Sequence, residues 1–366
     1  MRAFLGLLAV GLLVVVALVG WSFRRYQQFE FVDVPGIESA PADQPTNWLL
    51  VGTDSREGVD PEDDDFIGDA GEVPGERADT IMVGRVDPDT KTIDLLSIPR
   101  DLWVPIVGAD ENRINSAFSA AGGRERLVLT IENYLGIHVN HYVEVNFAGF
   151  QQMVEALDGV PLWFDSPTRD SMSGLNIVDA GCHVLNGPQA LSYARARHVE
   201  RYIDGQWVAD GTSDLGRTAR QREFLARVAS SASSQATVGG MLTMDRLVAS
   251  AANNLVVDNN AGFRDLAQLA QSFADAQGGN FTTHSLPVTD WVTPSGAQVL
   301  LLQTEAAQPV LDMFRTPGEG LPQNGELSGD QTIPESKGGT VVVLSPQEMA
   351  STAVPGIGRD QCLTNQ

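Results

Sequence analysis

Residues 80–98 read TIMVGRVDPDTKTIDLLSI, two apolar runs on either side of a short polar segment. The runs Thr80–Val86 and Thr92–Ile98 are rich in aliphatic and β-branched residues, which predicts strands. Asp87–Lys91 between them has the Pro and Asp composition of a turn. We therefore predict a β-hairpin here, and a further buried strand at Trp48–Val51, a short apolar run that ends in a glycine.

The segments that follow alternate between helical and strand patterns. Apolar residues at helical spacing predict helices at residues 125–135, 147–157, 187–196, 213–232, 245–255 and 262–277. Two further strands are predicted, at Val139–Val145 and Phe281–Leu286. This mixture predicts an α/β fold of α-β-α layers, in which helices flank a central mixed β-sheet, over residues 47–315. Residues 316–366 are rich in Gly, Pro, Ser and Glu, which predicts a mostly disordered C-terminal tail.

The composition excludes one large class of partner. The 366 residues include 47 acidic and 24 basic side chains, which gives a net charge of -23. A phosphate backbone would repel a chain this acidic, and no helix-turn-helix with a basic face precedes the apolar N-terminal run. We therefore expect no nucleic-acid partner. The apolar content of 43% is that of a globular protein with a substantial core.

The N-terminus has the composition of a membrane anchor. Ala3–Gly20 is uncharged and approaches the length of about 20 apolar residues that a spanning helix needs, and Trp21 follows at the expected interface. A cleaved signal peptide is the alternative, but no Ala-x-Ala site follows the run. We predict a single-pass transmembrane anchor over residues 1–25 and a membrane-proximal linker over residues 26–46. Arg2 before the run and two arginines after it leave the orientation open.

Charged residues cluster where the predicted strands begin and end. Arg56 follows the first strand, and Arg77 and Asp79 precede or begin the second. Arg100 and Asp101 follow the third. Layered α/β folds bind ligands at strand ends, so we expect these side chains to share one site.

Two predicted helices add further charged residues. Arg195 and Arg197 lie two positions apart, so they share a face only if the preceding helix ends near Arg195, which we predict. On the helix that starts at residue 213, Asp214, Arg217 and Gln221 fall on one stripe that continues into apolar residues. Buried charge is costly unless it is paired or used. Two interpretations remain: a local Asp214–Arg217 pair, or the polar floor of an anion-binding pocket.

Guanidinium groups beside carboxylates favour one kind of ligand. Arginine binds phosphate oxygens in a bidentate manner, so several arginines at one site suit a pyrophosphate. Carboxylates next to phosphate hold divalent ions, and oxygen ligands favour Mg²⁺. Asp79 is the candidate metal ligand, with Asp54, Asp65 or Asp69 as a second. Such residues could catalyse phosphoryl transfer by positioning and charge neutralisation.

Six stretches of the chain resemble the LytR-CpsA-Psr family of cell-wall phosphotransferases, in the family's order. They are NWLLVGTDSR, RADTIMVGRVDPDTKTIDLLSIPRD, NRINSAFSAAGG, GVPLWFD, LNGPQALSYARARH and DLGRTARQREFL. They cover residues 47–230, with weaker similarity up to residue 315, and the Arg-rich, Lys-poor composition is typical of actinobacteria-like members. A membrane anchor before an external domain also fits the family.

The resemblance implies a function. The chain would transfer a phosphoryl-linked glycopolymer from a polyprenyl-pyrophosphate carrier to the C6 hydroxyl of peptidoglycan muramic acid, and polyprenyl phosphate would be the leaving group. Mg²⁺ would be the cofactor, with Mn²⁺ as the alternative ion. The catalytic domain would be extracytoplasmic and attached to the cell membrane. Arabinogalactan or a related wall polymer would be the group transferred.

The resemblance also assigns roles by position. Asp79 would bind the metal, Asp101 beside Arg100 would be the candidate general base, and these three would form the catalytic group. Asp214 would orient the arginines. The other residues of the pyrophosphate site would be Arg56, Arg77, Arg195, Arg197, Arg217, Arg220 and Gln221. An apolar pocket for the polyprenyl tail would be lined by Phe118, Phe147, Phe150 and Val154, which fit equally well as ordinary core residues.

The chain departs from the family pattern in one segment and carries a pair of cysteines. Tyr202–Gly211 separates the two-arginine segment from DLGR, and we interpret it as a loop insertion over the site that either tunes the acceptor or covers the pyrophosphate. Cys182 and Cys362 would meet oxidising conditions outside the cell, which permits a disulfide that ties the tail to the domain.

Two other functions share these observations. A hydrolase of polyprenyl-pyrophosphate-linked saccharide would use the same site with water as the acceptor. A non-catalytic scaffold would bind wall or lipid without a reaction, and only then would Arg100→Ala and Asp79→Ala leave wall-polymer attachment intact.

Overall fold

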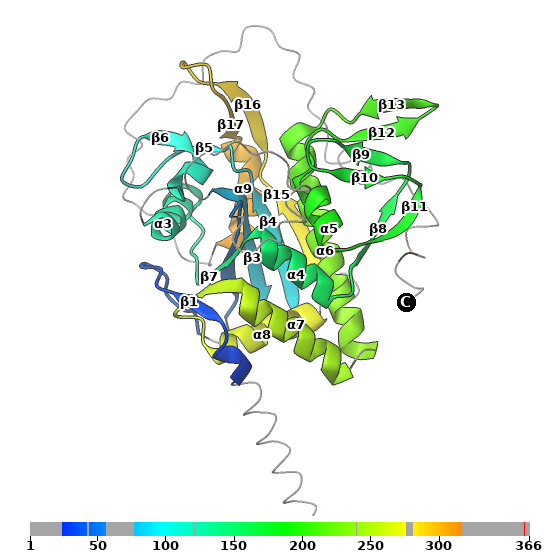
Figure 1. The fold of residues 1–366 in the computed structure, drawn as a ribbon. Coiled ribbons are helices and arrows are strands. Elements are labelled where there is room, and N and C mark those ends of the chain that lie inside the picture. The colour runs from blue at the N-terminus through cyan, green and yellow to red at the C-terminus, as the bar shows by residue number, and fades with distance from the viewer. Residues whose placement is uncertain are drawn as a thin grey trace, which may run out of the picture.

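The computed structural model describes residues 24–41, 44–55, 77–119, 122–238, 240–275, 281–315 and Cys362. Helices cover a central mixed β-sheet, which confirms the predicted α/β class (Figure 1). Seven of the described strands form this sheet, in the order β1-β14-β7-β2-β3-β4-β15. Their bounds in that order are Glu30–Val32, Leu255–Asp258, His141–Val145, Thr46–Thr53, Ala78–Asp87, Thr92–Ile98 and Phe281–Ser285.

Smaller sheets and the helices surround this sheet. The four-stranded sheet consists of β10 (Leu175–Ile177), β9 (Thr168–Asp170), β12 (Glu200–Ile203) and β13 (Gln206–Ala209). Three pairs are β5 (Trp103–Pro105) with β6 (Glu111–Arg113), β8 (Val160–Phe164) with β11 (Gly181–Leu185), and β16 (Val288–Val292) with β17 (Gln298–Leu302). The helices are η1 (Ile114–Ala117), α3 (Gly123–Leu135), α4 (Phe147–Ala156), α5 (Gly187–Arg195), α6 (Ser213–Val238), α7 (Gly240–Asn254), α8 (Phe263–Asp275) and α9 (Thr304–Phe314).

The predicted hairpin forms part of the middle of the sheet. β3 and β4 pair antiparallel, with Ile81 opposite Ile98. In the turn, the Asp87 carboxylate accepts hydrogen bonds from the backbone N–H groups of Asp89 and Thr90, at 2.9 and 3.1 Å. These bonds close the turn in the way that its Asp-rich sequence predicts.

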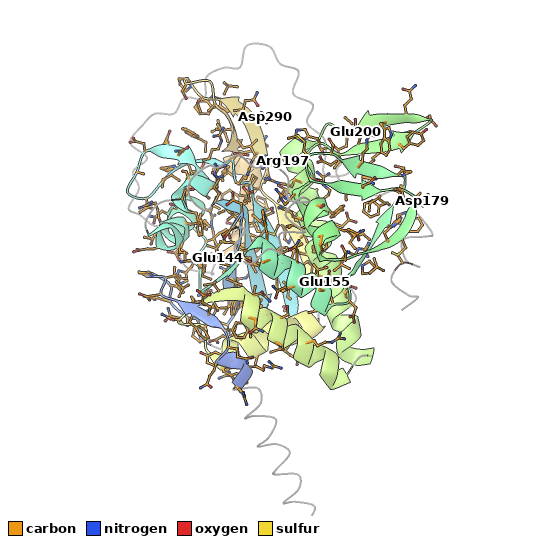
Figure 2. The ribbon with its side chains drawn as sticks, viewed as in Figure 1. Glu144, Glu155, Asp179, Arg197, Glu200 and Asp290 are labelled. Carbon is orange, nitrogen blue, oxygen red and sulfur yellow. A yellow bond between two sulfur atoms is a disulfide. The ribbon has the colours of Figure 1, made fainter. Side chains whose placement is uncertain are left out.

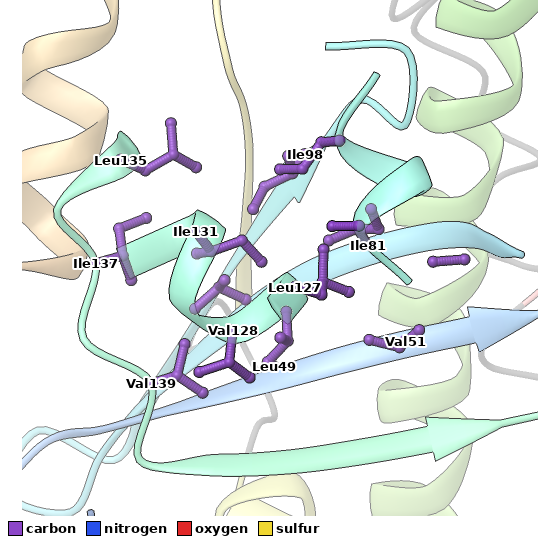
Figure 3. Packing of buried hydrophobic residues seen from close by; sticks show 14 of the residues in the cluster. Leu49, Val51, Ile81, Ile98, Leu127, Val128, Ile131, Leu135, Ile137 and Val139 are labelled. Atoms are coloured by element: carbon purple, nitrogen blue, oxygen red, sulfur yellow. The ribbon is translucent and has the colours of Figure 1, made fainter. Parts of the chain in front are cut away.

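β2 is buried on both faces because helices lie on both sides of the sheet. Leu49 and Val51 point into the core cluster against α3, where Leu127 and Ile131 meet them (Figure 3). Strand side chains alternate, so Trp48 points the opposite way and packs in a second cluster with residues of β14 and α8. The apolar run that predicted this strand is therefore continuous because both of its faces need apolar contacts.

The folded part begins earlier than predicted. Residues 26–46 were expected as a linker, but β1 pairs in parallel with β14, and Val34 and Ile37 are buried in the core. The sequence did not reveal this strand because it is only three residues long and lies in a segment with three prolines. Its partner strand also lies more than 200 positions further along the chain.

The predicted loop insertion at Tyr202–Gly211 is instead most of a β-hairpin. β12 and β13 pair antiparallel, with Tyr202 opposite Trp207. Asp204 and Gly205 form the turn with φ angles of 49° and 83°, the left-handed geometry that a two-residue hairpin turn requires.

The sequence predicts a membrane anchor at the N-terminus and a disordered tail at the C-terminus. No helix among the described residues is long and apolar enough to cross a bilayer, and the anchor predicted at residues 1–25 lies outside them apart from its last two residues. The predicted tail, residues 316–366, lies outside them apart from Cys362. The disulfide between Cys182 on β11 and Cys362 is present, with Cα atoms 5.5 Å apart.

Candidate active site

Four neighbouring strands of the central sheet, β7, β2, β3 and β4, begin or end at the same edge. β2 and β7 run parallel, with Gly52 opposite Val145, so both end here. β3 runs the other way and begins here, with Thr80 opposite Gly52. β4 returns to the same edge, with Ile98 opposite Ile81. The first residues of β3 and the residues after β2 and β4 therefore meet, as their strand-end positions predicted.

A series of ion pairs between side chains of alternating charge lies along this edge. The Arg100 guanidinium forms an ion pair with Asp79, and its Nε lies 3.5 Å from Asp101 Oδ2. Asp101 Oδ1 in turn lies 3.1 Å from Arg113 Nε, at the end of β6. The Arg100 side chain is only 16% exposed, so these contacts are screened less by water than surface ion pairs are. The structure thus brings together the three residues predicted as the catalytic group and adds a fourth.

The start of β3 is also tied to the end of β2. The Asp54 N–H donates to the Arg77 carbonyl at 3.2 Å, and the Arg77 N–H donates to Asp54 Oδ1 at 2.8 Å. These bonds fix two further predicted residues at the same edge. The remaining predicted residues Arg56, Asp65 and Asp69, and the side chain of Asp214, lie outside the described part of the chain.

α5 ends with one predicted arginine, Arg195, and a second, Arg197, follows just after the helix. The helix ends at Arg195, as predicted, because Ala196 adopts an extended ψ of 130°. The Arg195 guanidinium lies over the ring of Phe147, the first residue of α4, 4.8 Å from the ring centroid. The Phe147 N–H donates to the carbonyl of Ser55, directly after β2, at 3.4 Å. Arg195 is therefore linked through one aromatic ring to the same sheet edge.

Asp170 fixes the backbone of the segment that carries Arg197. Its carboxylate is 1% exposed, and Oδ2 accepts hydrogen bonds from the N–H groups of Arg197 and His198 at 2.7 and 2.8 Å. Oδ1 accepts from the N–H groups of Met172 and Ser173 at 2.9 and 3.3 Å. Burial alone would raise the pKa of Asp170, but the four hydrogen bonds together outweigh it and lower the pKa below its ordinary value.

α6 places its predicted stripe against α4 and the end of α5. Arg217 is 4% exposed, and one turn later Gln221 Nε2 donates to the Ala194 carbonyl at 3.2 Å. Phe224 continues the stripe as a buried residue whose ring centroid lies 5.2 Å from that of Phe150. The stripe faces inward, as predicted, and its polar end lies beside the arginine segment.

Arg220 links α6 to the residue that follows α5 and to the residue that follows β13. It donates through Nη2 to the Ala196 carbonyl and through Nη1 to Asp210 Oδ2 at 3.2 Å. The Asp210 N–H donates to the Val199 carbonyl at 2.9 Å. Arg220 and Gln221 thus both bond to other residues of the protein in this structure. Their contacts with pyrophosphate remain a prediction.

Comparison with known proteins identifies the family. The sequence profile of the LytR_cpsA_psr family matches residues 24–315. The chain belongs to the LytR-CpsA-Psr family. It is 32% identical over 310 residues to the "Probable cell wall biosynthesis protein LcpB" of Corynebacterium glutamicum, covering 85% of this chain and 70% of that protein.

Other relatives and solved structures agree with this membership. The "Polyisoprenyl-teichoic acid--peptidoglycan teichoic acid transferase TagU" of Halalkalibacterium halodurans is 31% identical over 243 residues, 61% of this chain and 70% of that protein. The fold matches a LytR-Csp2A-Psr enzyme from Actinomyces oris with a TM-score of 0.62 at 25% identity, covering 78% of this chain and 95% of that chain. It also matches TagV of B. subtilis with a TM-score of 0.58 at 24% identity, covering 75% and 99%.

The carboxylates at this site suit a metal ion that is coordinated jointly by the protein and by a substrate phosphate. Within the described ranges, no group of three or more His, Cys, Asp or Glu side chains could hold an ion by itself. Mg²⁺ is commonly held by one or two carboxylates together with substrate phosphates. Asp79, 28% exposed beside Arg100, supplies a carboxylate of that kind.

The four residues predicted to line a lipid pocket do not form one group. Phe118 packs in the core cluster between the sheet and α3. Phe147 and Phe150 pack with Leu191, and Val154 lies in the cluster that also holds Phe224 of α6. Three of the four thus belong to α4, and the role of all four as a lipid pocket remains a prediction.

Two residues that build the site were not predicted. Arg113 lies in the quoted stretch NRINSAFSAAGG, but nothing local distinguishes it from a surface arginine. Asp170 lies among short polar segments, and two of its partners are 27 and 28 positions away. No pattern in a single sequence reports such a distant side chain to backbone contact.

Proposed function

We propose that this chain transfers a phosphoryl-linked glycopolymer from a polyprenyl-pyrophosphate carrier to the C6 hydroxyl of peptidoglycan muramic acid. The observation that carries the proposal is the Asp79–Arg100 ion pair at the sheet edge to which Phe147, the ring under the Arg195 guanidinium, is also hydrogen-bonded. The name of the relative TagU supports it, since it describes a transferase with a polyisoprenyl-linked donor and peptidoglycan as acceptor.

The arginines supply the charge that this reaction needs. The acceptor oxygen attacks the phosphorus that bears the glycopolymer, the bond from that phosphorus to the bridging oxygen breaks, and polyprenyl phosphate leaves with the electron pair. Arg100, Arg195 and Arg197 would bind the non-bridging oxygens and stabilise the charge of the transition state. The register of β4 and the bonds of Asp170 hold two of these residues in place before substrate binds.

The proton of the acceptor hydroxyl needs a base, and we assign this role to Asp101. Its Oδ2 faces Arg100 and its Oδ1 faces Arg113, so the carboxylate is held beside the phosphate-binding side chains. A base must lie within hydrogen-bond reach of the proton it removes, which this position allows when the acceptor approaches along Arg100.

Mg²⁺, or Mn²⁺ in its place, is the proposed cofactor, with Asp79 as its protein ligand. When bound together with the diphosphate, such an ion neutralises phosphate charge and polarises the phosphoryl oxygens. Asp79 also pairs with Arg100, so the same carboxylate positions a guanidinium group.

We further propose that the domain is extracytoplasmic and that the single helix predicted at residues 1–25 attaches it to the cell membrane. The Cys182–Cys362 disulfide supports an oxidising compartment. The polyprenyl tail would lie against Phe147, Phe150 and Val154. The group transferred would be arabinogalactan or a related wall polymer, and the name of the relative LcpB supports a role in cell wall biosynthesis.

Incubation of the purified protein with a lipid-linked oligosaccharide, Mg²⁺ and peptidoglycan fragments tests the proposal. We expect a saccharide–peptidoglycan product and release of lipid phosphate, both lost in Arg100→Ala. Release of saccharide phosphate alone would identify a hydrolase. Binding of lipid with no product of either kind would identify a scaffold.

A further inference from the structure

A second surface begins where the chain of ion pairs ends. Arg113 on β6 is opposite Trp103 on β5, so the two side chains share one face of this hairpin. Trp103 Nε1 donates to Glu111 Oε2 at 3.2 Å. Trp291 on β16 packs edge-on against Trp103, with ring centroids 6.3 Å apart. We call Trp103, Trp291, Glu111 and Arg113 the tryptophan surface.

Backbone bonds fix the tryptophan surface to the candidate active site. The Leu300 N–H on β17 donates to the Asp101 carbonyl at 3.0 Å, and Leu300 also bridges to Leu102. Arg113 Nη2 donates to a carbonyl of β17, that of Gln298, at 2.9 Å. Leu102 is fully buried between two half-buried neighbours, so the side chains before and after it point away from the core. The β5–β6 hairpin therefore begins two residues after Asp101, and β17 of the other hairpin is hydrogen-bonded to the Asp101 backbone.

The chemistry of this surface suits a sugar chain. A pyranose ring has an apolar C–H face, which packs on an aromatic ring, and a rim of hydroxyl groups, which pair with carboxylates and guanidinium groups. Trp103 and Trp291 are half-buried, and Glu111 and Arg113 lie beside them. Arg113 and Glu111 supply a donor and an acceptor of hydrogen bonds beside the two rings, which suits the hydroxyl and amide groups of an amino sugar.

We infer that the tryptophan surface binds the glycan strand of the peptidoglycan acceptor and holds its hydroxyl beside Asp101 and Arg100. This inference rests on the proposed function and adds the acceptor subsite to it. The distance along the chain from Asp101 to Trp103 is two residues, so a sugar packed on Trp103 would place a neighbouring sugar at the ion pairs.

The location of the tryptophan surface favours a glycan over a lipid bilayer as its ligand. β5, β6, β16 and β17 lie at the end of the molecule opposite the first described residues, drawn in dark blue (Figure 1). With the anchor proposed at residues 1–25, which precedes those residues in the sequence, the tryptophan surface would face away from the bilayer. Figure 2 shows Asp290 of β16 at the same end as Arg197.

A second half-buried tryptophan, in another part of the molecule, provides a matched control. Trp163 lies on β8, and Figure 1 shows β8 on the opposite side of the molecule from β5 and β6. Its Nε1 donates to Asp165 Oδ1 at 2.8 Å, as Trp103 Nε1 donates to Glu111. Trp163 therefore carries the same kind of indole–carboxylate bond at a different place in the fold.

Kinetics with the acceptor varied test the inference. Trp291→Ala should raise the KM for peptidoglycan fragments about tenfold, the loss expected when one aromatic contact is removed, while the KM for the lipid-linked donor stays at the native value. Trp291→Phe should recover most of the loss, since it keeps an aromatic face. Trp163→Ala should leave the acceptor KM unchanged, and thermal unfolding should show all three variants folded.

Direct binding of chitotetraose, a soluble chain of N-acetylglucosamine, provides the second arm. Calorimetry should show binding to the native protein that weakens about tenfold in Trp291→Ala and not in Trp163→Ala. Equal chitotetraose affinity and equal acceptor KM in the native protein and in Trp291→Ala would overturn the inference. Binding of the native protein to anionic phospholipid vesicles that is lost in Trp291→Ala but kept in the control variant would also overturn it, because the surface would then bind lipid. Failure of the native protein to form any transfer product would instead refute the proposed function, and the calorimetry would still decide whether this surface binds glycan.

Discussion

The two sides of the candidate active site are built in different ways. On the β3–β4 side, charged side chains face one another: Arg100 contacts both Asp79 and Asp101, and sheet register sets their positions. On the α5–α6 side, polar side chains hold main-chain atoms: Asp170 binds N–H groups, and Arg220 binds a carbonyl. The difference shows that a sheet positions charged groups through strand pairing, whereas the end of a helix needs buried polar side chains to fix its direction.

The α5–α6 side is further braced by one buried tyrosine. The Tyr193 hydroxyl on α5 donates to Glu223 Oε2 on α6 at 3.1 Å. Burial, followed by the neighbouring Glu223 carboxylate, raises the pKa of Tyr193 well above its ordinary value. Tyr193 therefore stays protonated throughout the working pH range and keeps donating this bond. Helix α5 is thus held at its last turn by hydrogen bonds to both its side chains and its backbone.

The largest effect is expected on the β3–β4 side. Arg100→Ala should lower the transfer rate by about 100- to 1000-fold, because it removes a preorganised donor to the phosphate and leaves two carboxylates facing each other. Transfer of labelled saccharide to peptidoglycan fragments measures the rate. Arg246→Ala, which removes an exposed pair with Asp158 at 3.2 Å, should leave the rate at the native value. A native rate in Arg100→Ala would remove the β3–β4 side from the mechanism.

On the α5–α6 side the main effect should be on stability. Asp170→Asn replaces one carboxylate oxygen by an NH₂ group that cannot accept, so two of four hydrogen bonds are lost, and we expect about 3 kcal/mol less stability at pH 7. Urea unfolding measures the loss. Asp312→Asn, in an exposed pair with Arg315, is the control and should change stability by less than about 0.5 kcal/mol.

The pH dependence of that loss follows from the lowered pKa of Asp170. Stability from the ionised carboxylate is present above the unfolded pKa of about 4 and is lost as the pH falls through the lower folded value. The difference between native protein and Asp170→Asn should therefore be complete at pH 7 and shrink below about pH 4. A difference that grows in acid would contradict this assignment.

Most of the β3–β4 side was predictable from sequence, and the reason is local. Thr92–Ile98 was predicted with its observed bounds, since alternating aliphatic residues and an Asp-Pro turn are signals within a few positions of one another. Asp79 and Arg100 then follow from their places at strand ends. Arg113 does not, because its contact with Asp101 depends on how a separate hairpin, β5–β6, folds back.

Less of the α5–α6 side was predictable. The inward stripe of α6 was correct because helical periodicity reports which face is buried. Asp170 was missed because its partners are backbone groups distant in sequence. The β12–β13 hairpin was missed although its signal was present: Asp204-Gly205 between two short strands is a strong hairpin pattern, and the exposed, charged strands around it obscured the signal.

Gln221 gives a smaller test of the same side. If it acts by holding the Ala194 carbonyl, Gln221→Ala should lower stability by about 1 kcal/mol. Gln206→Ala, an exposed glutamine on β13, should not change stability. Unchanged stability of Gln221→Ala with a raised donor KM would show instead that Gln221 contacts the pyrophosphate and does not position α5.

The smallest effect on the reaction is expected at the disulfide, which belongs to neither side. Cys182→Ser with Cys362→Ser should leave the transfer rate unchanged, because a cross-link mainly restricts the unfolded chain. Thiol titration of the denatured, unreduced native protein should find no free thiol, and single Cys182→Ser should show one. Two free thiols in the native protein would contradict the disulfide.

A crystal structure with bound polyprenyl diphosphate tests the central claim, that both sides of the site hold one diphosphate group. We expect phosphate oxygens within hydrogen-bond distance of Arg100 from the β3–β4 side and of Arg195 or Arg197 from the α5–α6 side. A diphosphate bound elsewhere, or in contact with only one of the two sides, would contradict it.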